Sequence, residues 1–556
     1  MASRNPATTP VERSASPCDI ALIGFEDQEN LGMRAVAAYL AQNGVSVRII
    51  SCQDTSAEAI LSKLISARPR IVGFSLIFQR MLPRFANLIQ YLRNNGISAH
   101  FTMGGHFPTL EYEGVLSYIP ALDTIVRHEG ERTLLELLEH VDDPQSWDSV
   151  AGIAFRRDGR IVATRARSLI RDLDSLPFVL RSDKVALHRG IGLCSIAGSR
   201  GCYYDCSFCS IQEFYRQPAG PKRRSRSPAH VALEMEHLYK NLGVRIFIFQ
   251  DDDLYMKGGP YRHWVTTFLN ELKRRNLAGE ILWRISCRID DVDAEMLLKM
   301  REAGLVGVYL GIESGSDQGL ETFNKHYHVE DVYHALAILR DIEIPYEYGF
   351  MIFEPYSTTD TVRANVEFLK ELDSYGSALA NFCKMAPYAG TPIARRLSAE
   401  DRLEGTLDSP DYRFLDSRLD LLQLFVTQTF NFRNFSNQGL VERLRFAKFD
   451  CAVLDKFYAH SYDTHRYAKT VRSLIADCNR TALEALSLAT ALVESRTHEE
   501  TVALWPLLRK WQQDEWEAEA RITRELDLVQ QEYGLIAGLP QPGLSLSQET
   551  LVPSYA

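Results

Sequence analysis

From residue 19 onwards, short apolar stretches alternate with longer amphipathic stretches. Apolar runs predict strands at 20–24, 46–50, 71–75 and 99–103, amphipathic runs predict helices at 31–43 and 84–94, and a strand-helix pair follows within 124–139. Strands that alternate with helices in this way form a parallel, doubly wound sheet, whose ligands bind beyond the carboxyl ends of the strands. We therefore predict a small Rossmann-like α/β binding domain at 19–145, after a flexible tail at 1–18.

A second alternating series begins at Ile191. It predicts strands before Ser199 and at 245–250, 281–287, 307–312, 346–352 and 378–385, separated by helices of which the first spans 228–241. Six such units are too few for a complete eight-unit barrel. We predict a partial (βα)6 TIM barrel at 191–396. A linker at 146–190 precedes it and contains a β-hairpin with a type I′ turn at Asp158-Gly159.

The strand pattern stops at about residue 397, and an α-helical domain is predicted for 397–556. Amphipathic stretches at 440–458 and 469–493 predict helices. Trp505, Trp511 and Trp516 lie on a further helix, and we expect most of these rings to be buried. The chain after Gly538, with three prolines, is expected to be irregular.

Composition and charge exclude several function classes. A length of 556 residues with 46% hydrophobic residues allows two or three domains with proper cores. No apolar run approaches the roughly 20 residues that a membrane-spanning helix needs, and the start of the chain carries no apolar signal segment. The formal net charge of −10 argues against general nucleic-acid binding. We expect a soluble, cytoplasmic monomer that binds neither nucleic acid nor membrane.

Three of the ten cysteines lie in Gly201-Cys202-Tyr203-Tyr204-Asp205-Cys206-Ser207-Phe208-Cys209. This spacing lets one short loop hold three corners of a four-iron cluster and leaves the fourth iron open to bind and reduce a ligand. The alternatives are a zinc site, a disulfide loop or accidental cysteines. Zinc needs a fourth Cys or His nearby, and none follows at such a spacing. Disulfides are unexpected because the ten cysteines are scattered and no signal segment is present.

The motif resembles that of the radical S-adenosylmethionine (radical SAM) enzymes, in which Phe208 fills the aromatic position before the last cysteine. The resemblance implies that Cys202, Cys206 and Cys209 bind a [4Fe–4S] cluster whose open iron chelates SAM, with Phe208 beside it. One electron, delivered by a flavodoxin- or ferredoxin-type donor, then splits SAM into methionine and a 5′-deoxyadenosyl radical, which abstracts a hydrogen atom. An open six-unit barrel is the fold that this family uses.

A dense basic run, Lys222-Arg223-Arg224-Ser225-Arg226, follows the cysteine loop. Such a run is usually a solvated loop. Binding an anionic substrate or a reductase is the alternative.

Loops after the strands of the first domain carry polar residues and glycines. The paired glycines Gly104-Gly105 admit a bulky ligand close to the backbone. The order of these loops resembles the cobalamin-binding domain, with Asp-x-His-x-x-Gly, Ser-x-Leu and Gly-Gly patterns, in the version fused to radical SAM enzymes. The resemblance implies cobalamin contacts from Asp27, Glu29, Gly32, Ser75, Leu76, Ile77, Gln79, Gly104, Gly105, His106, Glu129, Gly130 and Glu131.

The first of these patterns departs from the family at one position. Glu29 stands where the cobalt-ligating histidine would be, and a loop carboxylate is more often a hydrogen-bonding or surface group than a cobalt ligand. The fused family commonly lacks this histidine. We therefore expect cobalamin with no histidine ligand and with its dimethylbenzimidazole displaced from cobalt.

Polar residues at the carboxyl ends of barrel strands face the active site. Asp251, Asp252 and Asp253 follow the second strand, where adjacent carboxylates repel one another unless they meet cations. The resemblance implies that Asp251 and Asp252 contact the SAM amino group. Helix capping and metal binding are the alternatives.

Three further rim segments bear on the site. Arg288 is a candidate for holding the SAM carboxylate or for a structural salt bridge. Gly311-Ile312-Glu313-Ser314 resembles the family's Gly-Ile-Glu-Ser motif, which implies that Glu313 contacts the SAM ribose with Ser314 beside it. In the fifth-strand segment, Phe353 and Tyr356 replace glycines expected in relatives, either to shape a substrate cavity or as simple packing.

The resemblance covers residues 19–396 and implies radical C-methylation of an unactivated carbon in a small, secondary metabolite or a peptide. One SAM would methylate cobalamin and another would generate the radical. The second hypothesis is a non-methylating rearrangement, cyclisation or ring contraction. The third is a cobalamin-sensing regulator, which the intact cysteine loop and Glu313 argue against. Neither the substrate nor a further catalytic residue can be read from the chain.

Overall fold

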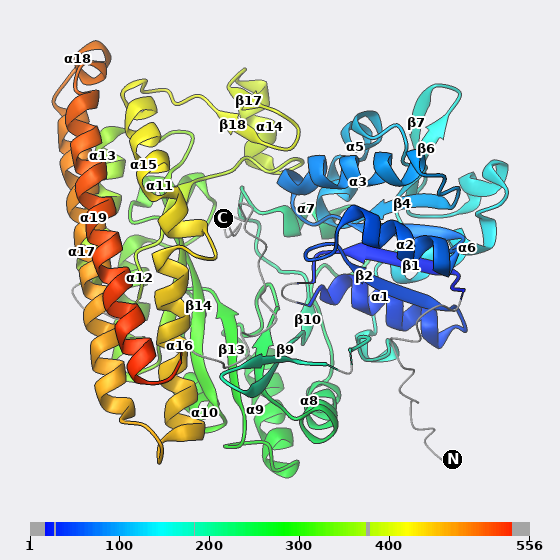
Figure 1. The fold of residues 1–556 in the computed structure, drawn as a ribbon, viewed down its shortest axis with the longest axis horizontal. Helices are drawn as coiled ribbons and strands as arrows, with labels where there is room; N and C mark the ends of the chain where they lie inside the picture. Colours follow the sequence, from blue (N-terminus) through cyan, green and yellow to red (C-terminus); the bar gives the residue numbers. More distant parts are fainter. Residues whose placement is uncertain (1–16, 27–28, 183, 374–377, 536–556) are drawn as a thin grey trace.

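The computed structural model describes residues 17–26, 29–182, 184–373 and 378–535. Predictions for residues 1–16, for the chain after Gly538 and for Asp27 fall outside these ranges. Figure 1 shows an N-terminal α/β domain and a set of long C-terminal helices on opposite sides of a central barrel. The fold class predicted from the sequence is confirmed.

The N-terminal domain is built on a seven-stranded sheet of order β2-β1-β3-β4-β5-β6-β7. Its strands are β1 Ile20–Gly24, β2 Val47–Ser51, β3 Ile71–Ser75, β4 His100–Gly104, β5 Thr124–Val126, β6 Ile153–Arg157 and β7 Arg160–Ala163. Its helices are α1 Leu31–Gln42, α2 Ala57–Ala67, α3 Leu82–Asn94, α4 His106–Leu110, α5 Tyr112–Tyr118 and α6 Glu131–His140. Strands β1 to β5 are parallel.

Helices cover both faces of this sheet. One apolar core joins it to α1 and α6 through Met33, Leu40 and Leu137, and another joins it to α2 and α3 through Leu64 and Phe85. Successive strands are added on one side of β1 and then on the other, so the strand order reverses between β1 and β3. The segments after these two strands meet there, since Asn30 donates to Ser75. In doubly wound sheets this switch point is where ligands bind.

The predicted hairpin forms at β6 and β7, with Asp158 and Gly159 both at positive φ as a type I′ turn requires. The hairpin is not free-standing. Strand β6 pairs antiparallel with β5, so the first sheet continues through Ala163, past the boundary at residue 145. The pairing covers an edge of β5 that would otherwise leave backbone groups unpaired.

The central domain is a curled sheet of order β16-β15-β14-β13-β12-β9-β8. Six strands are parallel and follow chain order, namely β9 Ile191–Ile196, β12 Val244–Phe249, β13 Leu282–Cys287, β14 Leu305–Glu313, β15 Tyr346–Phe353 and β16 Cys383–Lys384, while β8 Ala186–His188 pairs antiparallel at one edge. Helices α7 Ser210–Arg216, α8 Pro228–Leu242, α9 Gly259–Arg274, α10 Ala294–Glu302, α11 Asp317–Thr322, α12 Val329–Asp341, α13 Thr359–Asp373 and α14 Pro392–Ala399 follow the strands. Two small antiparallel pairs complete it, β10 Ser199–Arg200 with β11 Arg224–Ser225 and β17 Leu403–Gly405 with β18 Pro410–Tyr412.

The C-terminal part is helical, with α15 Arg418–Phe435, α16 Leu440–Tyr458, α17 Thr464–Glu494, α18 His498–Val502 and α19 Trp505–Glu532. Helix α16 packs against barrel strands, since Val453 shares an apolar cluster with Ile246 and Leu282. Helix α19 lies along α17 on the outer side (Figure 1). Trp505 and Trp511 are only partly buried and Trp516 is 44% exposed, so the prediction that most of these rings are buried was wrong.

Among the described residues, no helix combines the length and the apolarity that a membrane crossing requires.

Candidate active site between the cysteine loop and the N-terminal sheet

The cysteine loop runs from β10 to α7 and begins with a glycine that no other residue replaces without strain. Gly201 has a φ of 78°, and a Cβ atom there would lie 2.1 Å from the Lys222 carbonyl oxygen. The backbone therefore passes close to the strand that follows it, and Cys202 comes directly after this close approach.

Backbone contacts tie the loop to the rim of the barrel. The Ser207 amide donates to the Phe323 carbonyl at 3.0 Å, and its hydroxyl donates to the Thr322 carbonyl at 2.6 Å. The Phe208 ring packs edge-on against Phe323, with centroids 5.2 Å apart. The segment after α11 thus fixes the part of the loop between Cys206 and Cys209.

The three thiols of the loop are free. All ten cysteines of the chain are free, which excludes the disulfide alternative. Burial raises the pKa of Cys202 and of Cys209 to about 12, so these thiols ionise when a metal takes the proton's place. Within the described ranges, no three His, Cys, Asp or Glu side chains gather as ligands of one ion. A four-iron cluster needs no such convergence, because each thiolate binds a different iron.

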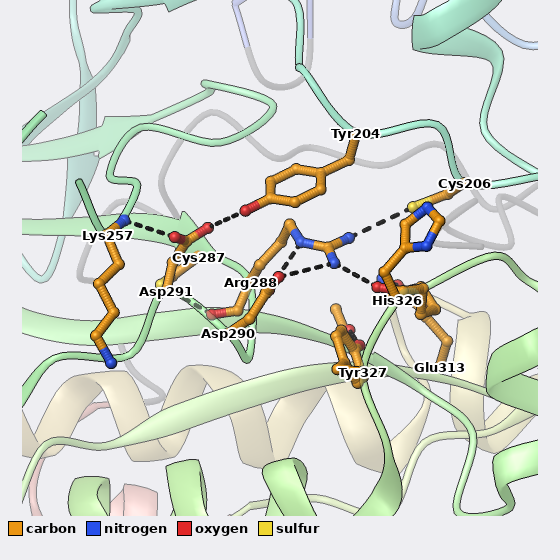
Figure 2. A network of polar contacts seen from close by, with 12 residues as sticks. Tyr204, Cys206, Lys257, Cys287, Arg288, Asp290, Asp291, Glu313, His326 and Tyr327 are labelled. Carbon is orange, nitrogen blue, oxygen red and sulfur yellow. Dashed lines mark hydrogen bonds and ion pairs between the residues drawn. The ribbon is translucent and has the colours of Figure 1, made fainter. Parts of the chain in front are cut away.

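Arg288 is the centre of a polar network beside the loop (Figure 2). Its Nη1 lies 3.5 Å from the Cys206 sulfur, its Nε donates to Asp290 at 2.9 Å, and its Nη2 donates to the Lys325 carbonyl at 2.6 Å. Its guanidinium also stacks 3.5 Å from the centre of the Tyr204 ring. Because the donors are already engaged, this geometry favours the structural alternative for Arg288 over a bidentate grip on SAM.

The three aspartates after β12 point in different directions. Asp251 is buried and accepts hydrogen bonds from the Gly198 amide, at 2.9 Å, and from the Ser199 hydroxyl. Asp252 is exposed and accepts from the Gly201 amide at 3.1 Å. Although solvent reaches this residue, desolvation of its carboxyl group and the neighbouring Asp251 raise its pKa to about 6. Of the two aspartates assigned to SAM, Asp252 is the more exposed residue.

Asp253 was not among the predicted contacts. It is 1% exposed, and neither carboxylate oxygen has a hydrogen-bond partner. Burial, with Asp291 adding to it, raises its pKa well above the ordinary value. Burial and the nearby Asp291 therefore favour the protonated form of this side chain.

Glu313 ends β14 in a left-handed conformation, with a φ of 69°. Such strain persists where the surrounding structure fixes it, commonly at functional sites. The Lys325 ammonium donates to Glu313 Oε1 at 3.3 Å, and a Cβ atom at Gly311 would lie 2.8 Å from that oxygen. Ser314 instead donates its hydroxyl to Asn365 at 3.1 Å. Lys325 thus fixes the orientation of the Glu313 carboxylate, whereas Ser314 stabilises the turn after β14.

In the fifth-strand segment, packing accounts for Phe353, which is fully buried against Phe414 with centroids 5.7 Å apart. Tyr356 is partly buried and donates its hydroxyl to Glu400 at 2.7 Å. Sequence reasoning missed the residue between them as a titratable group. Glu354 is 2% exposed, one of its oxygens has no partner, and burial raises its pKa to about 7.

Glycines allow close backbone contacts at the carboxyl edge of the N-terminal sheet. Gly105 has a φ of 122°, and a Cβ atom there would lie 2.0 Å from the Leu76 carbonyl oxygen, so the loops after β3 and β4 touch. The Ser75 hydroxyl accepts from Asn30 at 3.0 Å, while Ile77 is 40% exposed. The His106 ring packs on Phe214 of α7, and burial lowers its pKa to about 4.

Gly32 and Gly130 lie at the starts of helices, in the first turn of α1 and before α6. The side chain of Gln79 accepts from the Ala389 amide of the barrel at 3.2 Å. That contact joins the third-strand loop to the sixth-strand segment.

The acidic residues predicted to contact cobalamin are engaged elsewhere. Glu29 accepts from the Ser195 amide and from Arg181. Glu129 and Glu131 form ion pairs with arginines of the barrel. In each case the partner lies in or beside the central domain, so these carboxylates join the two domains.

The basic run is not a solvated loop. Arg223 and Arg224 are 4% and 5% exposed. Arg224 pairs with Glu129 at 2.9 Å and Arg226 pairs with Glu234 at 2.6 Å, because buried guanidinium groups need carboxylate or carbonyl partners. The sequence prediction for this run was therefore wrong.

A cavity of about 720 Å³ lies between the starts of β14 and β15 and helices α12, α16 and α17, and residues of the cysteine loop do not line it. None of the predicted site residues lines it.

Residues 25–138 match the family model of the B12 binding domain, and residues 196–369 match that of the radical SAM superfamily. The chain belongs to the cobalamin-dependent radical SAM enzymes. The groups that it implies are a [4Fe–4S] cluster, SAM and cobalamin. The free thiols of the loop and the glycine edge of the sheet fit them.

Three similar proteins carry different names. It is 29% identical over 395 residues to the anaerobic magnesium-protoporphyrin IX monomethyl ester cyclase of Rubrivivax gelatinosus, a match that covers 68% of each chain. It is 26% identical over 369 residues to an uncharacterized methyltransferase of Pyrococcus horikoshii, covering 65% of this chain and 77% of the relative. The solved cobalamin-dependent SAM radical enzyme OxsB, with aqua-cobalamin and SAM bound, superposes with a TM-score of 0.67 at 17% identity, over 95% of this chain and 82% of that chain. This last likeness shows the fold alone.

Proposed function

We propose that this protein is a radical C-methyltransferase that acts on an unactivated carbon of a small metabolite or a peptide. The observation that supports it most directly is the packing of α7 against α4. The rings of Phe214 and His106 lie 4.4 Å apart, centroid to centroid. Because α7 follows the cysteine loop and α4 follows the paired glycines, a cluster and a corrin bound at these places are neighbours.

The residues divide into three proposed sets. Cys202, Cys206 and Cys209 hold the cluster. Asp252 and Glu313 hold the amino group and the ribose of SAM, the first because it is the exposed residue of the two aspartates and the second because Lys325 fixes its carboxylate. When bound, the cluster and SAM supply a radical initiator and cobalamin supplies a transferable methyl group.

Cobalamin is proposed to bind at the carboxyl edge of the N-terminal sheet, over Ser75 to Gln79 and Gly104-Gly105. The exposed Ile77 and Phe78, each at 40%, offer apolar surface there. Large exposed apolar side chains side by side are typical of binding sites rather than of solvated loops. Glu29 stays bound to Ser195 and Arg181, so this carboxylate is not available as a cobalt ligand.

A second candidate function is a rearrangement or cyclisation without methyl transfer. The identity to the magnesium-protoporphyrin cyclase favours it, because that relative is named for a cyclisation. Both functions use the same cofactor sites, so the distinction lies in how SAM is consumed.

Counting the products of SAM separates the two functions. The enzyme is reconstituted anaerobically with iron, sulfide and cobalamin, then supplied with SAM, a reductant and candidate metabolites made by neighbouring genes. Methylation predicts two SAM consumed per turnover, equal S-adenosylhomocysteine and 5′-deoxyadenosine, and a product heavier by one methylene. Product with 5′-deoxyadenosine but without S-adenosylhomocysteine would reject methylation and establish the rearrangement.

We further propose a flavodoxin- or ferredoxin-type donor for the electron, and action in the cytoplasm. Ten free thiols support a reducing compartment. Substituting purified donor proteins for dithionite tests the first point, because a physiological donor should sustain turnover.

A further inference from the structure

A quartet of charged side chains joins the N-terminal sheet to the start of the cysteine loop. Arg200 donates to Glu129 at 2.9 Å and to Glu131 at 2.6 Å, while Arg224 donates to the same Glu129 oxygen at 2.9 Å. Glu129 and Glu131 lie between β5 and the first turn of α6, and the two arginines lie on β10 and β11. Cys202 is only two residues beyond Arg200. We call these four residues the Glu–Arg quartet.

Three side chains of the quartet are buried, Arg200 is 21% exposed, and the four charges balance. The side chains of Glu131 and Arg224 are 3% exposed, and that of Glu129 is 8% exposed. Burial by itself would raise the pKa of Glu129, but Arg200 and Arg224 hold it below the ordinary value. Two carboxylates face two guanidinium groups, so neither charge is left uncompensated. Buried ion pairs of this kind contribute geometry more reliably than net stability.

Protein donors already occupy three of the roughly four acceptor sites of the Glu129 carboxylate. Its Oε1 accepts from two arginines, and its Oε2 accepts from the Ile170 amide at 2.7 Å. The oxygen of Glu131 that faces the barrel is held by Arg200. The observed hydrogen bonds of Glu129 and Glu131 therefore go to protein donors, which argues against a role in binding the corrin.

A third carboxylate of the N-terminal domain, Glu29, holds the other end of the segment that leads into Cys202. Glu29 Oε2 accepts from the Ser195 amide at 2.7 Å and from Arg181 at 3.0 Å. Between these anchors, Asp251 holds the Gly198 amide at 2.9 Å. The chain from 195 to 201, which leads into Cys202, is therefore fixed at both ends by the domain that carries cobalamin.

We propose that Glu129 and Glu131 are positioning residues that set the cysteine loop against the cobalamin-binding sheet, and that they do not contact cobalamin. The inference rests on the proposed placement of the two cofactors, but not on methylation. Loosening the quartet should let the cluster shift relative to cobalt while each cofactor stays bound.

The test uses the full chain loaded with both cofactors. Glu131→Gln removes one charge of the quartet and keeps the side-chain shape. Asp142→Asn is the matched control, because Asp142 pairs with Arg70 at 2.6 Å in the same domain but is 82% exposed. Three readouts are taken: the Kd of hydroxocobalamin by absorbance, the dipolar coupling between the reduced cluster and cob(II)alamin by pulsed electron paramagnetic resonance, and the rate of product formation.

For Glu131→Gln we expect a cobalamin Kd within threefold of the wild type, a shifted or broadened dipolar coupling, and at least a tenfold loss of product. The control should match the wild type in all three. A tenfold weaker cobalamin affinity with unchanged coupling would make Glu131 a cobalamin contact and overturn the proposal. Unchanged coupling and unchanged affinity would overturn it too.

If Glu131→Gln does not fold, Arg200→Lys replaces it, since the ammonium keeps the charge but reaches only one of the two carboxylates. The same pattern of outcomes applies. The coupling is measured without substrate, so its result is independent of whether the protein methylates. Failure of the methylation proposal would instead appear only in the count of S-adenosylhomocysteine.

Discussion

Glu313→Gln tests the proposed SAM site with the least damage to the fold. The wild-type carboxylate accepts from Lys325 at 3.3 Å, and Lys325 is 3% exposed. Alanine would leave a buried ammonium without its partner, at a cost of about 3–5 kcal/mol in stability. Glutamine keeps the volume and an acceptor oxygen, so it isolates the loss of charge.

The expected effect follows from the kind of hydrogen bond that is lost. A hydrogen bond to a charged group contributes about 1.5–3 kcal/mol, against about 0.5–1.5 kcal/mol for a neutral pair. Two ribose hydroxyls that donate to Glu313 would then bind about 2 kcal/mol less tightly to glutamine. This corresponds to a roughly thirtyfold higher Kd for SAM.

Calorimetric titration of SAM into the reconstituted protein measures this change, with iron content and the cluster spectrum as checks that the loop is intact. Glu321→Gln, an exposed glutamate on α11, serves as the control and should bind SAM normally. If Glu313→Gln binds SAM as tightly as the wild type while its cluster is intact, Glu313 only positions Lys325 and the reasoning fails.

Two further predictions concern cobalt and a buried acid. Cob(II)alamin bound to the protein should give an electron paramagnetic resonance spectrum without nitrogen superhyperfine splitting, because Glu29 stands in the histidine position and is held by Ser195 and Arg181; such splitting would contradict the assignment. Glu354→Gln should stabilise the fold by about 3 kcal/mol at pH 8 and by progressively less as the pH falls towards 4.5. Burial raises the pKa of Glu354 from the ordinary 4.5 to about 7. Between these two values the unfolded chain loses a proton that the folded protein keeps, so the destabilisation by Glu354 grows over this range and is complete above it. Denaturant unfolding at pH 5 and pH 8 measures the difference, and an equal effect at both values would refute it.

Local patterns predicted the elements because they depend on neighbours in the chain. The apolar runs at Ile20–Gly24 and Ile71–Ser75 became β1 and β3 with those bounds, and the Asp158-Gly159 turn formed as expected. The spacing of the cysteines placed all three in one loop. In each case the signal lies within a few consecutive residues.

The partners of charged residues could not be predicted in this way. Glu129 is 71 positions from Arg200 and 95 from Arg224, and no periodicity links such residues. From the sequence, Arg288 could either bind SAM or form a structural salt bridge. The structure favours the second role, because Asp290 and the Lys325 carbonyl accept hydrogen bonds from its guanidinium group. The prediction of a solvated loop for the basic run was wrong, because the burial of Arg224 depends on its contact with Glu129 of the other domain.

The central claim is that Cys202, Cys206 and Cys209 carry the cluster on which SAM is cleaved. The most direct test replaces all three with alanine, reconstitutes the protein anaerobically and follows 5′-deoxyadenosine with dithionite as the reductant. The wild type should bind about one four-iron cluster and form 5′-deoxyadenosine, and the variant should do neither, while a protein with Cys18→Ala and Cys451→Ala, away from the loop, should behave as the wild type. Formation of 5′-deoxyadenosine by the triple variant would contradict the claim.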